Sequence, residues 1–153
     1  YQGGGRTMVD TMPINCGRNV IKLGKISRQS GVHIISTTGL HLEYYYPAHH
    51  WRYQLSEDQL TRLFIEDLEL GIDRFDYNGP VVQRSEHRAG LIKLATGDDP
   101  FTSHQELVFR AELHDFIWGQ KIAAREVVAE AGAVTGLEAV GLESGCFLTH
   151  HLA

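Results

Sequence analysis

The stretch A-G-L-I-K-L-A-T, residues 89–96, has the composition of a buried β-strand, yet it carries a lysine in its middle. Apolar residues flank Lys93 on both sides. A buried ammonium group without a partner costs several kcal/mol or gives up its proton. The strand therefore predicts one of two arrangements: a lysine that reaches solvent from the edge of a sheet, or a lysine with a chemical task.

Strand-like and helix-like segments alternate along the rest of the chain. Ser56 with Gln59 and Thr102 with Gln105 have the spacing of capping boxes, and Gly31 has the position of a left-handed helix stop. Short β-branched runs bounded by glycine and proline indicate strands. The predicted strands are 6–11, 32–36, 89–96 and 146–149, and the predicted helices are 18–30, 56–71 and 102 to about 131.

This alternation predicts parallel βαβ units and an α/β fold. No G-x-G-x-x-G pattern follows the first strand, and the sequence contains no Walker A pattern. These absences argue against the nucleotide-binding α/β folds. A complete (β/α)8 TIM barrel needs about 250 residues. We therefore predict a single domain, residues 1–153, that forms a partial (β/α)8 TIM barrel of about four βα units.

The composition is that of a soluble globular protein: 42% of the 153 residues are hydrophobic, 22% are charged, and the net charge is −5. This acidic balance argues against a nucleic-acid partner, which requires a basic patch. No apolar run approaches the ~18 to 20 residues that cross a bilayer, and no signal-peptide pattern is present, so we expect no membrane partner. Two cysteines, Cys16 and Cys146, make neither a disulfide framework nor a zinc knuckle, which favours a cytoplasmic location.

Polar residues stand at the carboxyl ends of the predicted strands, where parallel α/β folds collect their functional groups. These residues are Asp10, Thr37, Thr38, Lys93 and His150. Several have a structural alternative, because an aspartate at a strand end often caps the next helix and a histidine there is commonly a hydrogen-bonded structural residue. On periodicity alone, a metal site is therefore one interpretation among several.

Four blocks of the sequence carry a family resemblance: G-G-G-R-T-M-V-D (3–10), G-V-H-I-I-S-T-T-G-L (31–40), H-R-A-G-L-I-K-L-A-T-G (87–97) and L-T-H (148–150). They resemble successive blocks of the phosphotriesterase family, within the amidohydrolase-like metal-dependent hydrolases. The block around Lys93 is the most specific, and the resemblance runs through residues 3–111 and resumes at about 143–150. The blocks look like strands 2 to 5 of the family's (β/α)8 barrel.

The resemblance implies two divalent metals, usually zinc, at the carboxyl end of the barrel. Lys93 matches the catalytic-centre lysine, which takes up carbon dioxide and bridges both metals as a carbamate. His150 matches the fifth-strand metal ligand, and His41, which follows T-G-L, matches a substrate-pocket position. Asp10 matches a second-strand position that is not a ligand. The implied reaction is attack of a metal-bound hydroxide on a small-molecule ester, lactone or phosphotriester.

Elementary chemistry fits this use of a buried lysine. Desolvation lowers the pKa of an amine and leaves a neutral nucleophile that can capture carbon dioxide. The resulting carbamate is an anion with two hard oxygen ligands. Two cations a few ångströms apart polarise a phosphoryl or carbonyl oxygen and hold a hydroxide nucleophile.

The chain also departs from the family pattern. No two of its nine histidines are separated by one residue, so the H-x-H ligand pair is absent, and the sixth-strand histidine and eighth-strand aspartate have no counterpart. Residues 112–142 resemble no family block and are interpreted as an atypical helical segment or insertion. By itself, the chain is therefore expected to be a poor catalyst or inactive.

Two alternatives stand beside the metal-dependent hydrolase. The first is a catalytically inactive fragment or decayed barrel that acts only as a structural or interaction module. The second is a Schiff-base lyase in which Lys93 attacks a substrate carbonyl, although the family blocks favour the hydrolase. A partial barrel leaves open sheet edges and an uncovered inner face, so we also expect self-association.

Overall fold

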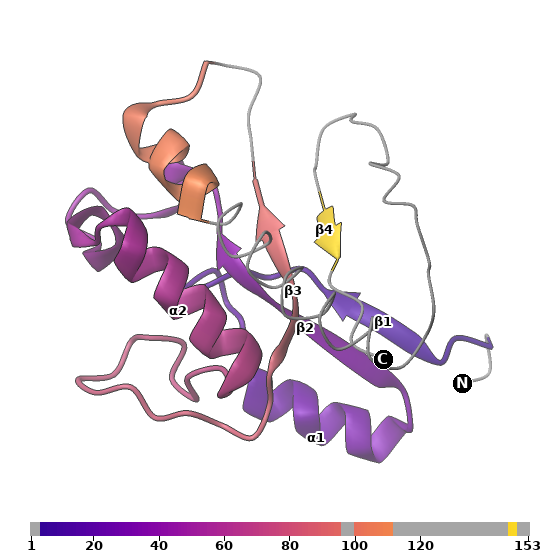
Figure 1. Cartoon of the computed structure of the whole chain (residues 1–153). Helices are drawn as coiled ribbons and strands as arrows, with labels where there is room; N and C mark the ends of the chain where they lie inside the picture. Colours follow the sequence, from indigo (N-terminus) through magenta and orange to yellow (C-terminus); the bar gives the residue numbers. More distant parts are fainter. Residues whose placement is uncertain (1–3, 96–99, 112–146, 150–153) are drawn as a thin grey trace, which may run out of the picture.

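The computed structural model describes residues 4–95, 100–111 and 147–149. They form a four-stranded sheet in the order β1-β2-β3-β4, with helices packed against it (Figure 1). No helix in this part of the chain is both long and apolar enough to span a bilayer. The elements are β1 (Thr7–Asp10), α1 (Val20–Ser30), β2 (His33–Leu40), η1 (Glu43–Tyr45), η2 (Trp51–Gln54), α2 (Glu57–Glu69), β3 (Ala89–Leu94) and β4 (Phe147–Thr149), and residues 103–111 are helical.

The first three strands run parallel, as the alternation of strands and helices predicts. Thr7 pairs with His33 across β1 and β2, and Gly39 pairs with Lys93 across β2 and β3. Parallel strands joined through helices are the repeating unit of a (β/α)8 barrel. The α/β class and the partial-barrel prediction are therefore confirmed for these strands.

β4 runs antiparallel to β3, so the expectation of four parallel strands is wrong at this edge. Phe147 pairs with Lys93 and Thr149 pairs with Leu91, so the carboxyl end of β4 points toward the start of β3. The free edge of a strand offers backbone donors and acceptors that pair with a neighbour of either direction. The direction of an edge strand therefore does not follow from the strand–helix alternation alone.

Capping residues set the helix ends. The Asn19 side chain accepts a hydrogen bond from the Lys22 N–H (3.0 Å), and α1 ends at Gly31, whose φ of 69° is left-handed. Ser56 and Gln59 form the predicted reciprocal capping box of α2. Both helices are confirmed, and α1 begins later than predicted because Asn19 serves as its cap rather than as part of its first turn.

β2 extends to Leu40, beyond its predicted end at Ser36. Thr37 and Thr38 are fully buried, and their hydroxyls donate hydrogen bonds of 3.1 and 2.9 Å to groups outside the strand. Because both hydroxyls have partners, the two threonines are accommodated inside a buried strand. The extension places Gly39 beside Lys93 of β3.

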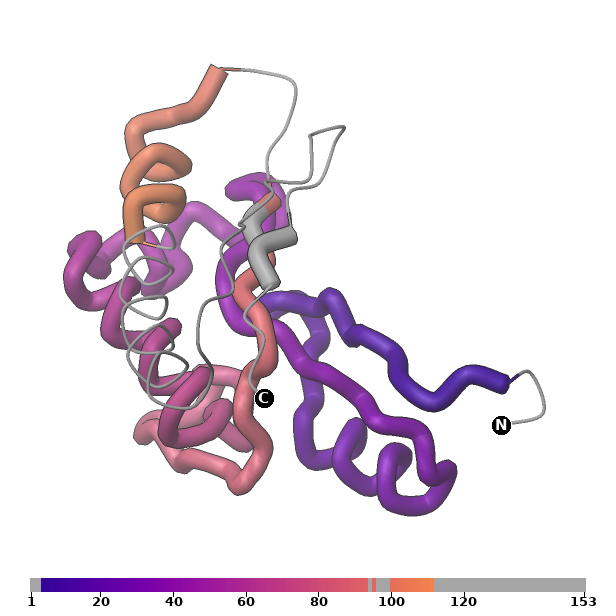
Figure 2. Tube along the Cα trace, turned by 45° about the vertical axis from the view of Figure 1, so that its right-hand side comes forward, coloured from indigo at the N-terminus to yellow at the C-terminus, as the bar shows by residue number. Residues whose placement is uncertain are grey.

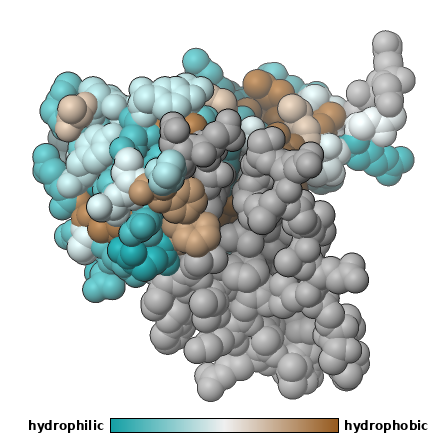
Figure 3. All heavy atoms as spheres, turned by 90° about the horizontal axis from the view of Figure 1, so that it is seen from above, coloured by the Kyte–Doolittle hydropathy of each residue, from teal (hydrophilic) through white to brown (hydrophobic). Residues whose placement is uncertain are grey.

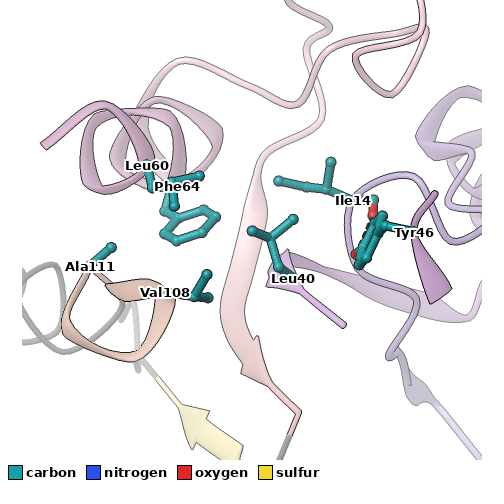
Figure 4. Close-up of a cluster of buried hydrophobic side chains, with 7 residues drawn as sticks. All are labelled: Ile14, Leu40, Tyr46, Leu60, Phe64, Val108 and Ala111. Carbon is teal, nitrogen blue, oxygen red and sulfur yellow. Dashed lines mark hydrogen bonds between the residues drawn. The ribbon is translucent and has the colours of Figure 1, made fainter. Parts of the chain in front are cut away.

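One hydrophobic cluster joins the sheet to the helices on one of its faces (Figure 4). Leu40 of β2 lies between Phe64 of α2 and Ile14. α2 and the helical residues 103–111 lie on the same side of the sheet in both Figure 1 and Figure 2, and α1 packs on this face through a second cluster. The buried members of the first cluster are Ile14, Leu40, Tyr46, Leu60, Phe64, Val108 and Ala111.

β1 forms an exposed apolar end of the described sheet. Met8 and Val9 of β1 are 53% and 42% exposed, and Met12, two residues after the strand, is 40% exposed. Figure 3 shows apolar surface on the side of the molecule where this strand lies. An exposed strand edge with apolar side chains is a template for pairing with another chain.

We therefore expect the purified protein to associate with increasing concentration in sedimentation experiments. Met8→Lys should weaken this association, because a charged side chain on an edge strand opposes pairing. Ile26→Lys is the matched control, since Ile26 is 51% exposed on α1, away from the edge. A protein that sediments as a sharp monomer at every concentration would contradict the expectation.

Candidate active site at the carboxyl ends of the strands

Lys93 lies on the face of the sheet that points away from the helices. On β2, Thr38 and Leu40 face α2, because the Thr38 hydroxyl donates to the Asp67 carboxylate (2.9 Å) and Leu40 belongs to the cluster packed on this helix. Side chains alternate between the two faces of a strand, so Gly39 faces the other way. Lys93 is directly paired with Gly39 and shares its face, which is the inner face of a barrel.

The described surroundings of Lys93 leave its charge without a partner. The residue is half-buried, and its ammonium group forms no hydrogen bond or ion pair with any residue that the structure describes. β3 lies between β2 and β4, so a lysine that reaches solvent from a sheet edge is not supported. Beside it, Gly39 has a φ of 102°, a conformation that favours glycine, and contributes no side chain of its own.

His41 follows β2, and hydrogen bonds to its backbone N–H and to its backbone carbonyl hold it in place. Its N–H donates to the Tyr46 hydroxyl (2.9 Å), and its carbonyl accepts a hydrogen bond from Arg52 Nη1 (3.0 Å). The imidazole packs against the Tyr45 ring, with 3.9 Å between the ring centroids. Burial and the nearby charge of Lys93 both lower the pKa of His41. The structure therefore brings His41 and Lys93 to the same end of the sheet.

Arg52 is a buried residue of this region that sequence reasoning missed. Its side chain lies between two aromatic rings, with its guanidinium carbon 4.4 Å from the centroid of Tyr46 and 5.2 Å from that of Tyr53. Its Nε donates to Nε2 of His104 (3.2 Å). The W-R-Y pattern of residues 51–53 is the signal that was available, because an arginine between aromatic residues is suited to stacking.

Asp10 lies at the end of β1 and takes a structural part. It pairs with Ser36 in the sheet register, and its Oδ1 accepts a hydrogen bond from the N–H of Met12 (3.4 Å). The carboxylate therefore turns back onto its own loop. This arrangement agrees with a position that is not a metal ligand.

The described residues match the expected metal centre only in part. Lys93 has the position of a bridging ligand on the inner face, directly paired with Gly39. Within the described residues, however, no group of three or more His, Cys, Asp or Glu side chains lies close enough together to hold a metal ion. His150 lies outside the described residues, so its role as a ligand stays a prediction. The part of the chain that the structure describes does not complete a metal site.

The histidines of this region predict that stability falls as the pH is lowered. Burial, followed by the charge of Arg52, lowers the pKa of His104 below its ordinary value of 6.5, and burial also lowers the pKa of His41 and His50. Below this pH the unfolded chain binds more protons than the folded chain does. The contribution of these histidines to the free energy of unfolding is therefore fully present above about pH 6.5 and is lost as the pH falls below it.

The free energy of unfolding, measured with urea at about pH 7.5 and about pH 6, should therefore be smaller at the lower pH. His104→Gln removes one of these titrating groups and should flatten the slope, because glutamine keeps an acceptor for Arg52 without taking up a proton. An identical slope in both proteins would contradict the part assigned to His104.

Comparison with known proteins identifies the family. The phosphotriesterase family profile matches residues 2–143. The chain belongs to the phosphotriesterase family. The match includes residues 112–142, whose structure lies outside the described residues, so their interpretation as an atypical segment stays a prediction.

Two curated relatives of this phosphotriesterase-family chain are named as hydrolytic enzymes. It is 36% identical over 98 residues to a phospho-furanose lactonase of Mycoplasmopsis synoviae, a match that covers 61% of this chain and 28% of the relative. It is 27% identical over 110 residues to an aryldialkylphosphatase of Saccharolobus solfataricus, covering 72% of this chain and 31% of the relative. The chain thus matches less than a third of the length of either relative.

Solved structures of the family share the fold. An amidohydrolase from Mycoplasma synoviae superposes with a TM-score of 0.69 and 30% identity, covering 76% of this chain and 34% of that one. A lactonase from Listeria monocytogenes gives a TM-score of 0.62 at 21% identity, covering 75% of this chain and 37% of that one. This phosphotriesterase-family chain therefore has the fold of one part of a larger barrel.

Proposed function

We propose that this protein is a hydrolase of ester-like bonds in small molecules, with lactones as the first candidates and phosphotriesters as the second. The observation that carries the proposal is the position of Lys93 on the inner face of the sheet, beside Gly39 and near His41. Its family membership and the lactonase and aryldialkylphosphatase among its relatives support a hydrolytic reaction. Lactones come first because the relative named a lactonase has the higher identity.

Each residue has a defined part in this proposal. Lys93, carboxylated by carbon dioxide, is the ligand that would help to hold two divalent cations, which we propose to be zinc. Bound there, the cations would polarise the bond under attack and supply the hydroxide nucleophile. His41, at the same end of the sheet, is proposed to bind the substrate, and His150 is proposed as a further ligand. A cytoplasmic location and the absence of a nucleic-acid or membrane partner remain predictions from the sequence.

Hydrolysis by the purified protein, supplied with zinc and bicarbonate, tests this proposal. We expect slow hydrolysis of a simple lactone and of a sugar phosphate lactone, because several family ligands have no counterpart in the chain. A chelator should abolish this rate. Lys93→Ala should abolish it too, whereas Lys25→Ala, on the exposed surface of α1, should leave it unchanged. A rate that survives in Lys93→Ala would contradict the proposal.

A second candidate function is a structural or interaction module that does not catalyse hydrolysis. Two observations favour it: the described residues form no group of three metal-ligating side chains, and β4 runs antiparallel to its neighbour. In that case the protein would hold no stoichiometric zinc in metal analysis, and any trace hydrolysis would be the same in Lys93→Ala. Stoichiometric zinc with a rate that depends on Lys93 would exclude the second candidate.

A further inference from the structure

We propose that Arg52 is a positioning residue, which together with Tyr46 fixes His41 as a neutral imidazole that carries its proton on Nε2. This inference rests on the proposed function in one respect: the Nε2–H group would donate its hydrogen bond to an oxygen atom of the substrate. The arrangement itself is built from hydrogen bonds among His41, Leu42, Tyr46 and Arg52.

The first step concerns the protonation of the His41 ring. The N–H of Leu42 donates a hydrogen bond to Nδ1 of His41 (2.8 Å). A backbone amide can only donate, so Nδ1 must be an acceptor and carries no proton. A charged imidazolium has protons on both nitrogens and does not fit this contact. The His41 ring is therefore neutral, and its proton lies on Nε2.

The second step concerns the main chain that carries this ring. The His41 N–H donates to the Tyr46 hydroxyl (2.9 Å), and that hydroxyl in turn donates to the carbonyl of Ile14 (2.8 Å). On the other side, Nη1 of Arg52 donates to the His41 carbonyl (3.0 Å). Both polar groups of the His41 backbone are thus anchored to buried side chains, which restricts the direction of the imidazole.

The third step concerns Arg52, which is only 1% exposed. A buried guanidinium is costly unless it is hydrogen-bonded and paired, yet Arg52 forms no ion pair with a carboxylate among the described residues. It is held instead by Nε2 of His104 (3.2 Å) and by the rings of Tyr46 and Tyr53. Its planar fork reaches His104 and His41 at the same time, which the single ammonium of a lysine does not reproduce.

An Nε2–H donor suits the substrates proposed above. The carbonyl and ring oxygens of a lactone and the phosphoryl oxygen of a phosphotriester are all acceptors. A donor that is already oriented binds such an oxygen with less loss of conformational freedom than a mobile side chain does. Arg52 thereby acts on substrate binding through His41, without touching the substrate.

Nitrogen-15 NMR of the histidine rings tests the inference. In uniformly labelled protein at about pH 8, two-bond proton–nitrogen correlations distinguish the Nε2–H from the Nδ1–H tautomer, and His41→Gln assigns the signals of residue 41. We expect a single Nε2–H pattern for His41. Arg52→Met should replace it with an average of both tautomers, whereas Arg62→Met, at an 81% exposed arginine of α2, should leave it unchanged.

Two further variants keep the test decisive if Arg52→Met does not give a cooperative thermal melt. Tyr46→Phe removes only the hydroxyl that accepts the His41 N–H, and Arg52→Lys keeps the charge without the fork. Tautomer averaging in either variant supports the inference. An Nδ1–H pattern in the unchanged protein, or an unaltered His41 pattern in folded variants at residue 52, would overturn it. The NMR measurement does not require catalytic turnover. A protein that keeps the fixed His41 tautomer but hydrolyses no substrate would therefore contradict the proposed function and not this inference.

Discussion

Arg18→Met is expected to lower the free energy of unfolding by about 3–5 kcal/mol, because it leaves the buried carboxylate of Asp76 without its cation and removes one of the two arginines that pair with Asp67. The Arg18 side chain is fully buried and lies 3.1 Å from the Asp67 carboxylate and 2.7 Å from that of Asp76. Its Nε forms the hydrogen bond to Asp76 (2.8 Å), and its Nη1 also donates to the Thr37 carbonyl (2.7 Å). Four parts of the chain therefore meet at this arginine.

The size of the effect should depend on pH. Burial raises the pKa of Asp76 to about 6, although Arg18 acts in the opposite direction. Without Arg18, this pKa should rise further, so the variant is least destabilised where Asp76 is protonated and most destabilised above about pH 7. The pKa of Asp76 in the unfolded chain is common to both proteins and cancels in the comparison, so the extra loss in the variant appears as the pH rises above about 6.

Urea unfolding of both proteins at about pH 5 and about pH 8 measures this prediction. Arg28→Met is the matched control, because Arg28 is exposed and its only described carboxylate partner, Glu86, is 3.4 Å away and also exposed. The control should change the free energy of unfolding by less than about 1 kcal/mol. An effect of Arg18→Met no larger than that of the control would contradict the view that this network stabilises the fold.

Gly71→Ala is the second substitution expected to be severe, at about 3 kcal/mol. Gly71 follows α2 with a φ of 116°, a conformation that strains any residue with a Cβ atom. A Cβ at this position would overlap the backbone carbonyl oxygen of Ser85. The segment cannot easily move aside, because Ser85 N–H donates to the Ile72 carbonyl (2.9 Å) and Ile72 N–H donates to that of His87 (2.8 Å).

Gly79→Ala separates this steric effect from a general loss of glycine. Its Cβ would lie 3.4 Å or more from its nearest neighbours, which is ordinary contact. We expect thermal and urea unfolding to show a large loss for Gly71→Ala and a change within about 0.5 kcal/mol for Gly79→Ala. Equal effects in the two variants would show that the approach of Ser85 to Gly71 does not constrain the fold.

Local chemistry explains why much of the fold follows from the sequence. The reciprocal contact of Ser56 with Gln59 and the left-handed Gly31 depend on neighbours within a few residues, so their patterns predict the helix ends correctly. Thr102 and Gln105 likewise form the predicted pair of hydrogen bonds (2.9 and 3.1 Å). The strand around Lys93 is also predicted correctly from its apolar residues, whereas its central position, which the sequence left open, follows from pairing with β2 and β4.

Features that depend on distant partners did not follow from the sequence. Ile26 is an apolar residue of α1 but is 51% exposed in the described part of the structure. The direction of β4 depends on pairing at a sheet edge. Arg52 is buried only because the Tyr46 and Tyr53 rings and His104 surround it, and the pairing of Asp67 with Arg18 joins residues 49 positions apart.

Carbon-13 NMR of the protein in labelled bicarbonate with zinc decides whether Lys93 is a metal-bridging carbamate or an ordinary lysine. We predict one carbamate carbon signal per chain, formed only in the presence of zinc and absent from Lys93→Arg, because arginine cannot be carboxylated in this way. Lys25→Ala should retain the signal, since Lys25 lies on the exposed surface of α1. A spectrum without a carbamate signal, or a signal that persists in Lys93→Arg, would contradict the role assigned to Lys93.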